Sequence, residues 1–157
     1  MESAKPQKEH EWLQQLVGEW RFEAPTQELE CKHTGTETVR SIGGLWIQAE
    51  GRSQMPEGQP SVMMLTIGFD PQKGKFVGTW LGSMMNYLWV YEVSLDPTGK
   101  ILSMDTVGPS FTDKDKMAKY REAIEIKSAD HRVFTSSVLG DDGNWQTFMA
   151  AEYKRVK

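Results

Sequence analysis

The sequence predicts an all-β fold, an up-and-down antiparallel β-barrel of about ten strands preceded by a short helix. Turn signals recur along the 157 residues, and β-branched and aromatic stretches lie between them, as in consecutive hairpins. No helical pattern alternates with these stretches, which argues against βαβ units. A closed barrel also removes the exposed edges of a sheet. Two packed sheets are the alternative architecture.

One helix is expected over residues 7–17, because its apolar residues recur at helical spacing and Gly18 is typical of a helix end. These apolar residues are Trp12, Leu13, Leu16 and Val17. We expect residues 1–6 to be flexible. Since 157 residues suit a single core, residues 1–157 are expected to form one domain.

The strands are expected between clusters of Gly, Pro and Asp. Two turns share an Asp-Pro start and a Gly-Lys end, FDPQKGK and LDPTGK, in which Asp bonds the turn backbone and Gly supplies a positive φ. The expected strands are 19–30, 34–42, 45–54, 61–69, 75–83, 86–95, 100–107, 116–127, 131–139 and 144–155.

Composition excludes several classes of function. The net charge is −4 and no basic run occurs, so a nucleic-acid partner is not expected. No apolar run approaches the ~18 residues of a membrane span, and the first residues lack an apolar signal core. A soluble, cytoplasmic protein is therefore expected. The single cysteine, Cys31, predicts neither a disulfide nor a thiolate cluster and is interpreted as a spectator thiol.

Alternation along residues 76–95 assigns the aromatic side chains to the barrel interior. Glu92 and Ser94 mark the outward face of the later strand. The same alternation leaves Leu88 and Val90 outside, under a loop or a partner chain. The predicted inward residues are Phe76, Gly78, Trp80, Gly82, Tyr87, Trp89, Tyr91, Val93 and Leu95.

Alternation also assigns inward faces to the last three strands. The predicted inward residues there are Ala118, Tyr120, Glu122, Ile124, Ile126, Phe134, Ser136, Val138, Trp145, Thr147, Met149, Ala151 and Tyr153.

The inward rings either fill a core or line a cavity. A few polar groups point the same way as the rings, and this mixture is typical of a small-molecule site. The sequence therefore predicts a barrel that binds a small, largely apolar ligand, with no catalytic residues assigned. The predicted ligand-binding residues are Met64, Trp80, Trp89, Tyr91, Tyr120, Glu122, Ser136 and Met149.

Glu122 is the most informative of these residues, because an ionised carboxylate is costly to bury without a partner. One interpretation is a structural ion pair with an inward arginine, either Arg40 or Arg155. The other is a functional group that orients a polar ligand end or serves as a general base. An isomerase- or hydrolase-like enzyme is thus the alternative to a binding protein, with binding favoured.

The three histidines show no metal-binding spacing, so neither a metal nor a cofactor is expected. His131 follows Asp130 and is interpreted as part of a solvated turn.

The segment Val17-Gly18-Glu19-Trp20 resembles the Gly-x-Trp signature of the calycins, the lipocalin and fatty-acid-binding barrels. The resemblance implies that Trp20 closes one end of the barrel and that a basic side chain of the last strand, Arg155, covers it. Nearly the whole chain resembles the bacterial family catalogued as domain of unknown function 1579. This likeness implies a calycin-like fold in a bacterial protein with no assigned activity. It is carried by VGEW, VRSIGGLWI, IGFDPQKGKFVGTWLGSM, LDPTGK and FTSSVLGDDGNWQTFMAAEYKR.

Two further hypotheses follow from single features. Barrels resembling nitrobindin share Gly-x-Trp and use a late histidine as haem ligand, a place that His131 would take, although the further glycines of that family are missing after Trp20. An interaction module, including a homodimer, is suggested by Leu88 and Val90 if they are exposed.

Overall fold

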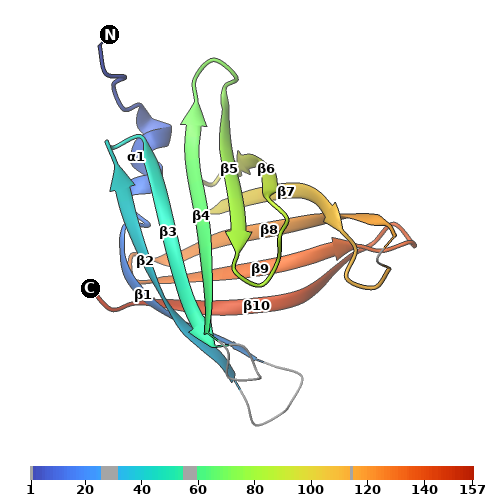
Figure 1. The fold of residues 1–157 in the computed structure, drawn as a ribbon. Helices are drawn as coiled ribbons and strands as arrows, with labels where there is room; N and C mark the ends of the chain where they lie inside the picture. The colour runs from blue at the N-terminus through green and yellow to red at the C-terminus, as the bar shows by residue number, and fades with distance from the viewer. Residues whose placement is uncertain (1, 26–31, 55–59, 114) are drawn as a thin grey trace.

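The computed structural model describes residues 2–25, 32–54, 60–113 and 115–157 (Figure 1). Cys31 and the end of the first predicted strand lie outside these residues. The elements are α1 (Lys8–Gln14), β1 (Gly18–Pro25), β2 (Lys32–Ile42), β3 (Trp46–Gln54), β4 (Pro60–Asp70), β5 (Lys75–Gly82), β6 (Trp89–Leu95), β7 (Ile101–Pro109), β8 (Met117–Ser128), β9 (His131–Leu139) and β10 (Trp145–Arg155).

The ten strands form one closed antiparallel barrel. Each strand pairs with its neighbours in sequence, and β1 pairs with β10 to close the ring. The predicted all-β up-and-down barrel with a short N-terminal helix is confirmed. The strand bounds agree with the prediction to within about two residues, except that β6 begins at Trp89 rather than at residue 86.

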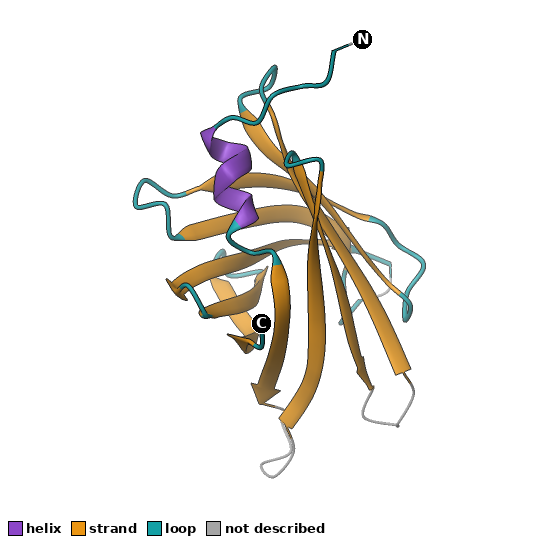
Figure 2. Cartoon of the chain, turned by 90° about the vertical axis from the view of Figure 1, so that its left-hand side faces the viewer, coloured by secondary structure: helices purple, strands orange, loops and turns teal. Residues whose placement is uncertain are grey.

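α1 lies at the upper end of the barrel in Figure 1 and leads directly into β1 (Figure 2). The backbone N–H of Gln7 donates to Nδ1 of His10 (2.9 Å), and the other ring nitrogen of His10 contacts the carbonyl of Phe69 (3.1 Å). The indole N–H of Trp12 donates to the carbonyl of Gly99 (2.8 Å), while Leu13 is fully buried. The helix therefore covers this end of the barrel.

The two Asp-Pro turns at this end have the predicted chemistry. One carboxylate oxygen of Asp96 accepts the backbone N–H groups of Lys100 and Ile101 (both 3.0 Å), and Asp70 accepts that of Gln72 (2.9 Å). Glycine closes each turn at positive φ, which other residues adopt only with strain: 63° at Gly74 and 74° at Gly99.

Trp20 plugs the α1 end, as the Gly-x-Trp resemblance implied. The side chain is 2% exposed, its indole N–H donates to the carbonyl of Leu16 (2.9 Å), and the Arg155 guanidinium lies 4.3 Å from the ring centroid. Arg155 also donates to the carbonyls of Gln15, Val17 and Ala129. Arg155 therefore ties the end of α1 to the turn between β8 and β9.

The outward face carries apolar residues on β5, β6 and the loop before β6. Leu88 is 52% exposed and Val90 61% exposed, which confirms that both point out of the barrel. In the described part of the chain, no helix has the length and apolar character needed to cross a bilayer.

A bulge corrects the predicted inward face of β10. The pairing with β9 shifts between Thr147 and Met149, so residues before the shift have the opposite orientation from those after it. Thr147 therefore lies outside, where its hydroxyl is 2.9 Å from that of Ser137, and Trp145 stacks outside with Arg121 (4.4 Å). Thr147 and Trp145 were wrongly predicted to face inward.

Candidate functional site

The half of the barrel away from α1 encloses a cavity of about 350 Å³. Rings and flexible side chains form much of its wall, including Trp80, Trp89, Phe134 and Met149. The aliphatic residues that fill the α1 half, such as Ile47, Ile67 and Leu102, do not line it. The cavity therefore begins where the branched aliphatic core ends.

Small inward residues create this space. Ala24, Ala49, Gly51, Ser136 and Ala151 come from β1, β3, β9 and β10, all line the cavity and all are buried. Each occupies an inward position where a large side chain would reach the barrel axis. The room for a ligand thus comes from short side chains that alternate with rings around the cavity wall.

Two cross-strand rows bring most of the predicted site residues together. Trp80 on β5 is directly opposite Trp89 on β6, and Glu122 on β8 is opposite Ser136 on β9, which is opposite Met149 on β10. Directly paired residues of antiparallel strands point to the same face. All five line the cavity.

Tyr120 lines the cavity within a group of aromatic side chains at the open end. Its ring lies 5.3 Å from Trp89 and 5.3 Å from Phe111, and Phe111 is 6.2 Å from Phe148. Phe111 and Phe148 are 63% and 54% exposed. Neither residue was predicted from the sequence, because Phe111 lies in a loop and Phe148 at the bulge of β10.

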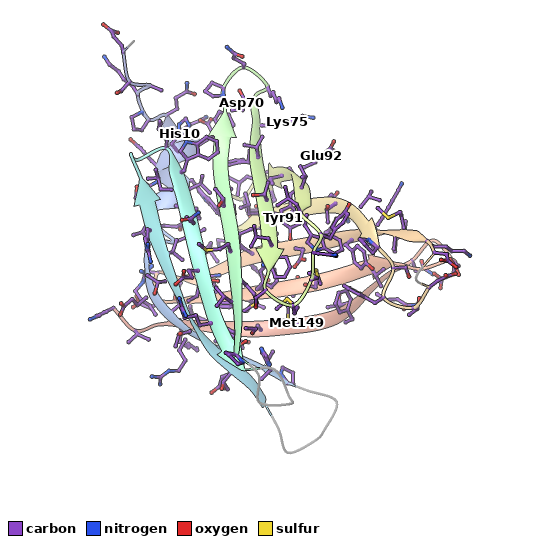
Figure 3. All side chains as sticks on the ribbon, viewed as in Figure 1. His10, Asp70, Lys75, Tyr91, Glu92 and Met149 are labelled. Carbon is purple, nitrogen blue, oxygen red and sulfur yellow. The ribbon has the colours of Figure 1, made fainter. Side chains whose placement is uncertain are left out.

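Tyr91 points inward but lies behind the cavity wall. The side chain is 4% exposed, and the hydroxyl donates to Glu122 (3.3 Å). In Figure 3, Tyr91 lies nearer to the α1 end than Met149 does. Tyr91 therefore contacts the cavity wall through its hydrogen bond to Glu122 and does not itself line the cavity.

Met64 was wrongly placed in the cavity wall. Met64 is paired with Leu81, which is 48% exposed, so both face outward. The neighbours of Met64, Met63 and Leu65, line the cavity instead. The run from Val62 to Leu65 is apolar on both faces. Alternation of polar and apolar residues therefore could not show which residues of β4 face inward.

Glu122 accepts two hydrogen bonds. The hydroxyl of Ser136 donates to one carboxylate oxygen (2.6 Å), and that of Tyr91 donates to the other (3.3 Å). Burial raises the pKa of Glu122 above its ordinary value, and the two hydrogen bonds oppose this rise. Burial and the adjacent carboxylate also raise the pKa of Tyr91. The predicted ion pair of Glu122 with Arg40 or Arg155 is wrong: Arg40 is exposed, and Arg155 binds backbone carbonyls outside.

The buried arginine of the cavity is Arg132, which sequence analysis missed. Arg132 is 3% exposed and donates to the carboxylate of Glu37 on β2. The guanidinium lies over the rings of Trp20 (4.6 Å) and Tyr153 (4.1 Å). Arg132 has the same phase on β9 as Phe134, so alternation continued by one step would have found it.

A second hollow of about 780 Å³ lies outside the barrel beside α1. It is more open than the interior cavity, and its lining includes Lys75 and Glu92 at the upper end of Figure 3. We favour the interior cavity as the candidate site, because rings converge there with the buried polar side chains of Arg132 and Ser136.

His131 lies away from the cavity. The side chain pairs with Glu152 at the start of β9 and does not line the interior. The structure therefore does not place His131 where the haem hypothesis requires a ligand.

Two solved structures share this fold. The crystal structure of Rv2717c from M. tuberculosis is similar with a TM-score of 0.58 and 12% identity, over 94% of this chain and 96% of that one. The S-type phycobiliprotein lyase CPES from Guillardia theta gives 0.55 and 13% identity, over 97% and 99%. At these identities the likeness concerns the fold alone. Among curated proteins, none matches this sequence.

A family model covers almost the entire chain, from residue 5 to residue 155. The match includes all ten strands and therefore every residue that lines the cavity. The chain belongs to this family, described as protein of unknown function DUF1579.

Proposed function

We propose that this protein binds one small, largely apolar molecule inside the barrel. The observation that carries the proposal is the unfilled half of the interior, about 350 Å³. This volume lies within the ~300–1,000 Å³ of typical small-molecule sites. The predicted residues Trp80, Trp89, Tyr120, Glu122, Ser136 and Met149 form part of its wall.

The distribution of polar groups supports binding over a solid core. Glu122 keeps some accessible surface because it faces the cavity, and Ser136 lies beside it. In a filled core, all the hydrogen bonds of these groups would have to be made within the protein. The alternative function is an enzyme that uses Glu122 as a general base. We favour binding, because the contacts of Glu122 are the two hydrogen bonds from Ser136 and Tyr91.

Titration with an apolar fluorescent dye tests the proposal. We expect saturable uptake of one dye per chain, and native mass spectrometry of protein purified without added ligand is expected to show a bound small molecule. Ala49→Phe, which projects a ring into the cavity, should abolish dye uptake. Lys75→Ala, in the outer hollow, should leave it unchanged.

The two variants decide where the dye binds. Loss of uptake in Lys75→Ala but not in Ala49→Phe would move the site to the outer hollow. A folded parent protein that takes up no dye, with folding checked by circular dichroism, would refute the proposal.

A further inference from the structure

The charged groups of the cavity are unequal in number. Among the described residues that line it, Glu37 and Glu122 are acidic and Arg132 is the basic residue besides His33. These side chains come from β2, β8 and β9. The interior therefore offers more negative than positive charge to a ligand.

The positive charge of Arg132 is already paired with a negative charge of the protein. Its guanidinium is paired with Glu37 and lies over two aromatic rings, those of Trp20 and Tyr153. Its Nε has no hydrogen-bond partner among the described residues, but this atom has no accessible surface. A ligand anion would therefore meet a guanidinium whose charge Glu37 already offsets, with a second negative charge, that of Glu37, beside it.

The hydroxyl groups beside Glu122 are also already engaged in hydrogen bonds within the protein. Tyr91 and Ser136 both donate their protons to the Glu122 carboxylate. Each carboxylate oxygen can accept more than one hydrogen bond. What this part of the wall presents to a ligand is consequently acceptor capacity rather than donors.

Taking the proposed function as given, we infer that the ligand is an apolar molecule with a hydrogen-bond-donating head, best a protonated amine, that binds Glu122. An ammonium group supplies the donors that the Glu122 oxygens can accept and offsets the excess negative charge. An anionic head would face Glu37 and Glu122 together. An alcohol lies between the two, since it donates one hydrogen bond without charge.

Octylamine, octanol and octanoate test this inference, because they share one alkyl chain and differ in the head. At pH 7 the amine is protonated and the carboxylate is ionised. Displacement of the apolar dye is measured for each. We expect octylamine to bind most tightly, octanol next and octanoate least, with about tenfold or more between the first and the last, as for a charge-assisted hydrogen bond.

Two variants test the residues. Glu122→Gln should weaken octylamine about tenfold and leave octanol nearly unchanged. Glu37→Gln removes the partner charge of Arg132 and should strengthen octanoate. Glu125→Gln is the matched control, since Glu125 is on β8 but pairs outside with Lys127 (3.0 Å), and it should preserve the parent ranking.

The outcomes separate this inference from the proposed function. Suppose that the parent takes up the dye. If octanoate then binds at least as tightly as octylamine, or if none of the three probes displaces the dye, the inference is overturned and the proposed function stands. An unchanged affinity for octylamine in folded Glu122→Gln would do the same. Absence of dye uptake in the parent would overturn both. If Glu37→Gln does not fold, the parent ranking and Glu122→Gln decide.

Discussion

The two halves of this barrel have the same strands but opposite interiors. Toward α1 the inward positions carry branched or long side chains that touch across the axis, and Ile47, Ile67, Leu102 and Met104 are each 0–1% exposed. Away from α1 the same strands carry Ala49, Gly51 and Ala151, and a cavity of about 350 Å³ lies between them. One half supplies stability and the other supplies space.

The difference teaches that small residues, more than rings, locate the cavity. Aromatic side chains occur in both halves: Trp20 and Phe76 lie in the packed half, and Trp80 and Trp89 line the cavity. A ring fills a core when a large residue faces it and lines a cavity when alanine or glycine faces it. The ring content of a strand therefore does not by itself distinguish the two.

Replacing one tryptophan in each half gives the largest contrast. Trp20→Ala should lower the free energy of unfolding by about 3–5 kcal/mol, because it leaves a void in a packed interior and breaks the hydrogen bond to Leu16. Trp80→Ala should cost clearly less, since its ring already borders empty space. Urea unfolding measures both. Equal losses would show that the halves are packed alike.

Trp80→Ala also has a binding consequence that Trp20→Ala lacks. Removal of a wall side chain should weaken dye uptake, whereas any folded fraction of Trp20→Ala should keep its affinity.

A pair of glycine substitutions sharpens the same comparison with smaller effects. At Gly78 a Cβ would lie 3.0 Å from the backbone oxygen of Thr66 and 3.5 Å from Ile67, so Gly78→Leu should overpack the core and cost roughly 1–3 kcal/mol or more. At Gly51 the nearest atom is the end of the Met63 side chain, 3.2 Å away. Gly51→Leu should therefore cost little stability and block dye uptake.

Thermal unfolding and dye titration of both variants are the measurements. A Gly51→Leu protein that binds dye like the parent, or a Gly78→Leu protein as stable as the parent, would contradict the division into halves.

The fold was predictable because its signals are local. The Asp-Pro turns at Asp70 and Asp96 and the recurrent turn signals each depend on a few neighbouring residues. The helix was expected over residues 7–17 but ends at Gln14, and Gly18 is the first residue of β1. The turn signals are also mutually consistent, and together they require a meander of antiparallel strands. Closure then follows from the cost of exposed edges.

The cavity wall was predictable only where strands alternate clearly. β6 and β8 carry polar residues on one face, and Trp89, Tyr120 and Glu122 line the cavity from the inward face that alternation gave them. In β4 both faces are apolar, so Met64 was chosen in place of Met63 and Leu65. Pairing register, which the sequence does not state, decides such cases.

Two further errors arise from long-range structure. The bulge in β10 reverses the phase before Met149, and no residue type marks it in the sequence. The partner of Glu122 was sought among arginines, but the inward arginine, Arg132, pairs with Glu37 from β2, a strand polar on both faces. Contacts between residues 95 positions apart depend on barrel closure, which alternation within a strand cannot reveal.

The smallest expected effect concerns the pH dependence of stability in the hollow half. Burial raises the folded-state pKa of Glu122 above its ordinary value of 4.5, so the folded protein holds a proton that the unfolded chain has already lost. Stability contributed by this group is therefore present below pH 4.5 and is lost as the pH rises through the folded pKa.

Glu122→Gln removes the titration while keeping a side chain of the same shape, whose amide oxygen can accept from one of the two hydroxyls and whose NH2 can donate to the other. The melting temperature of Glu122→Gln minus that of the parent should thus increase as the pH rises from about 4.5 toward the folded pKa. Glu125→Gln, which removes one negative charge from the outer face of β8, controls for net charge and should not reproduce this increase. Thermal melts between pH 4 and pH 8 measure all three proteins. A difference that decreases with rising pH would mean that the two hydrogen bonds outweigh burial and lower the folded pKa of Glu122.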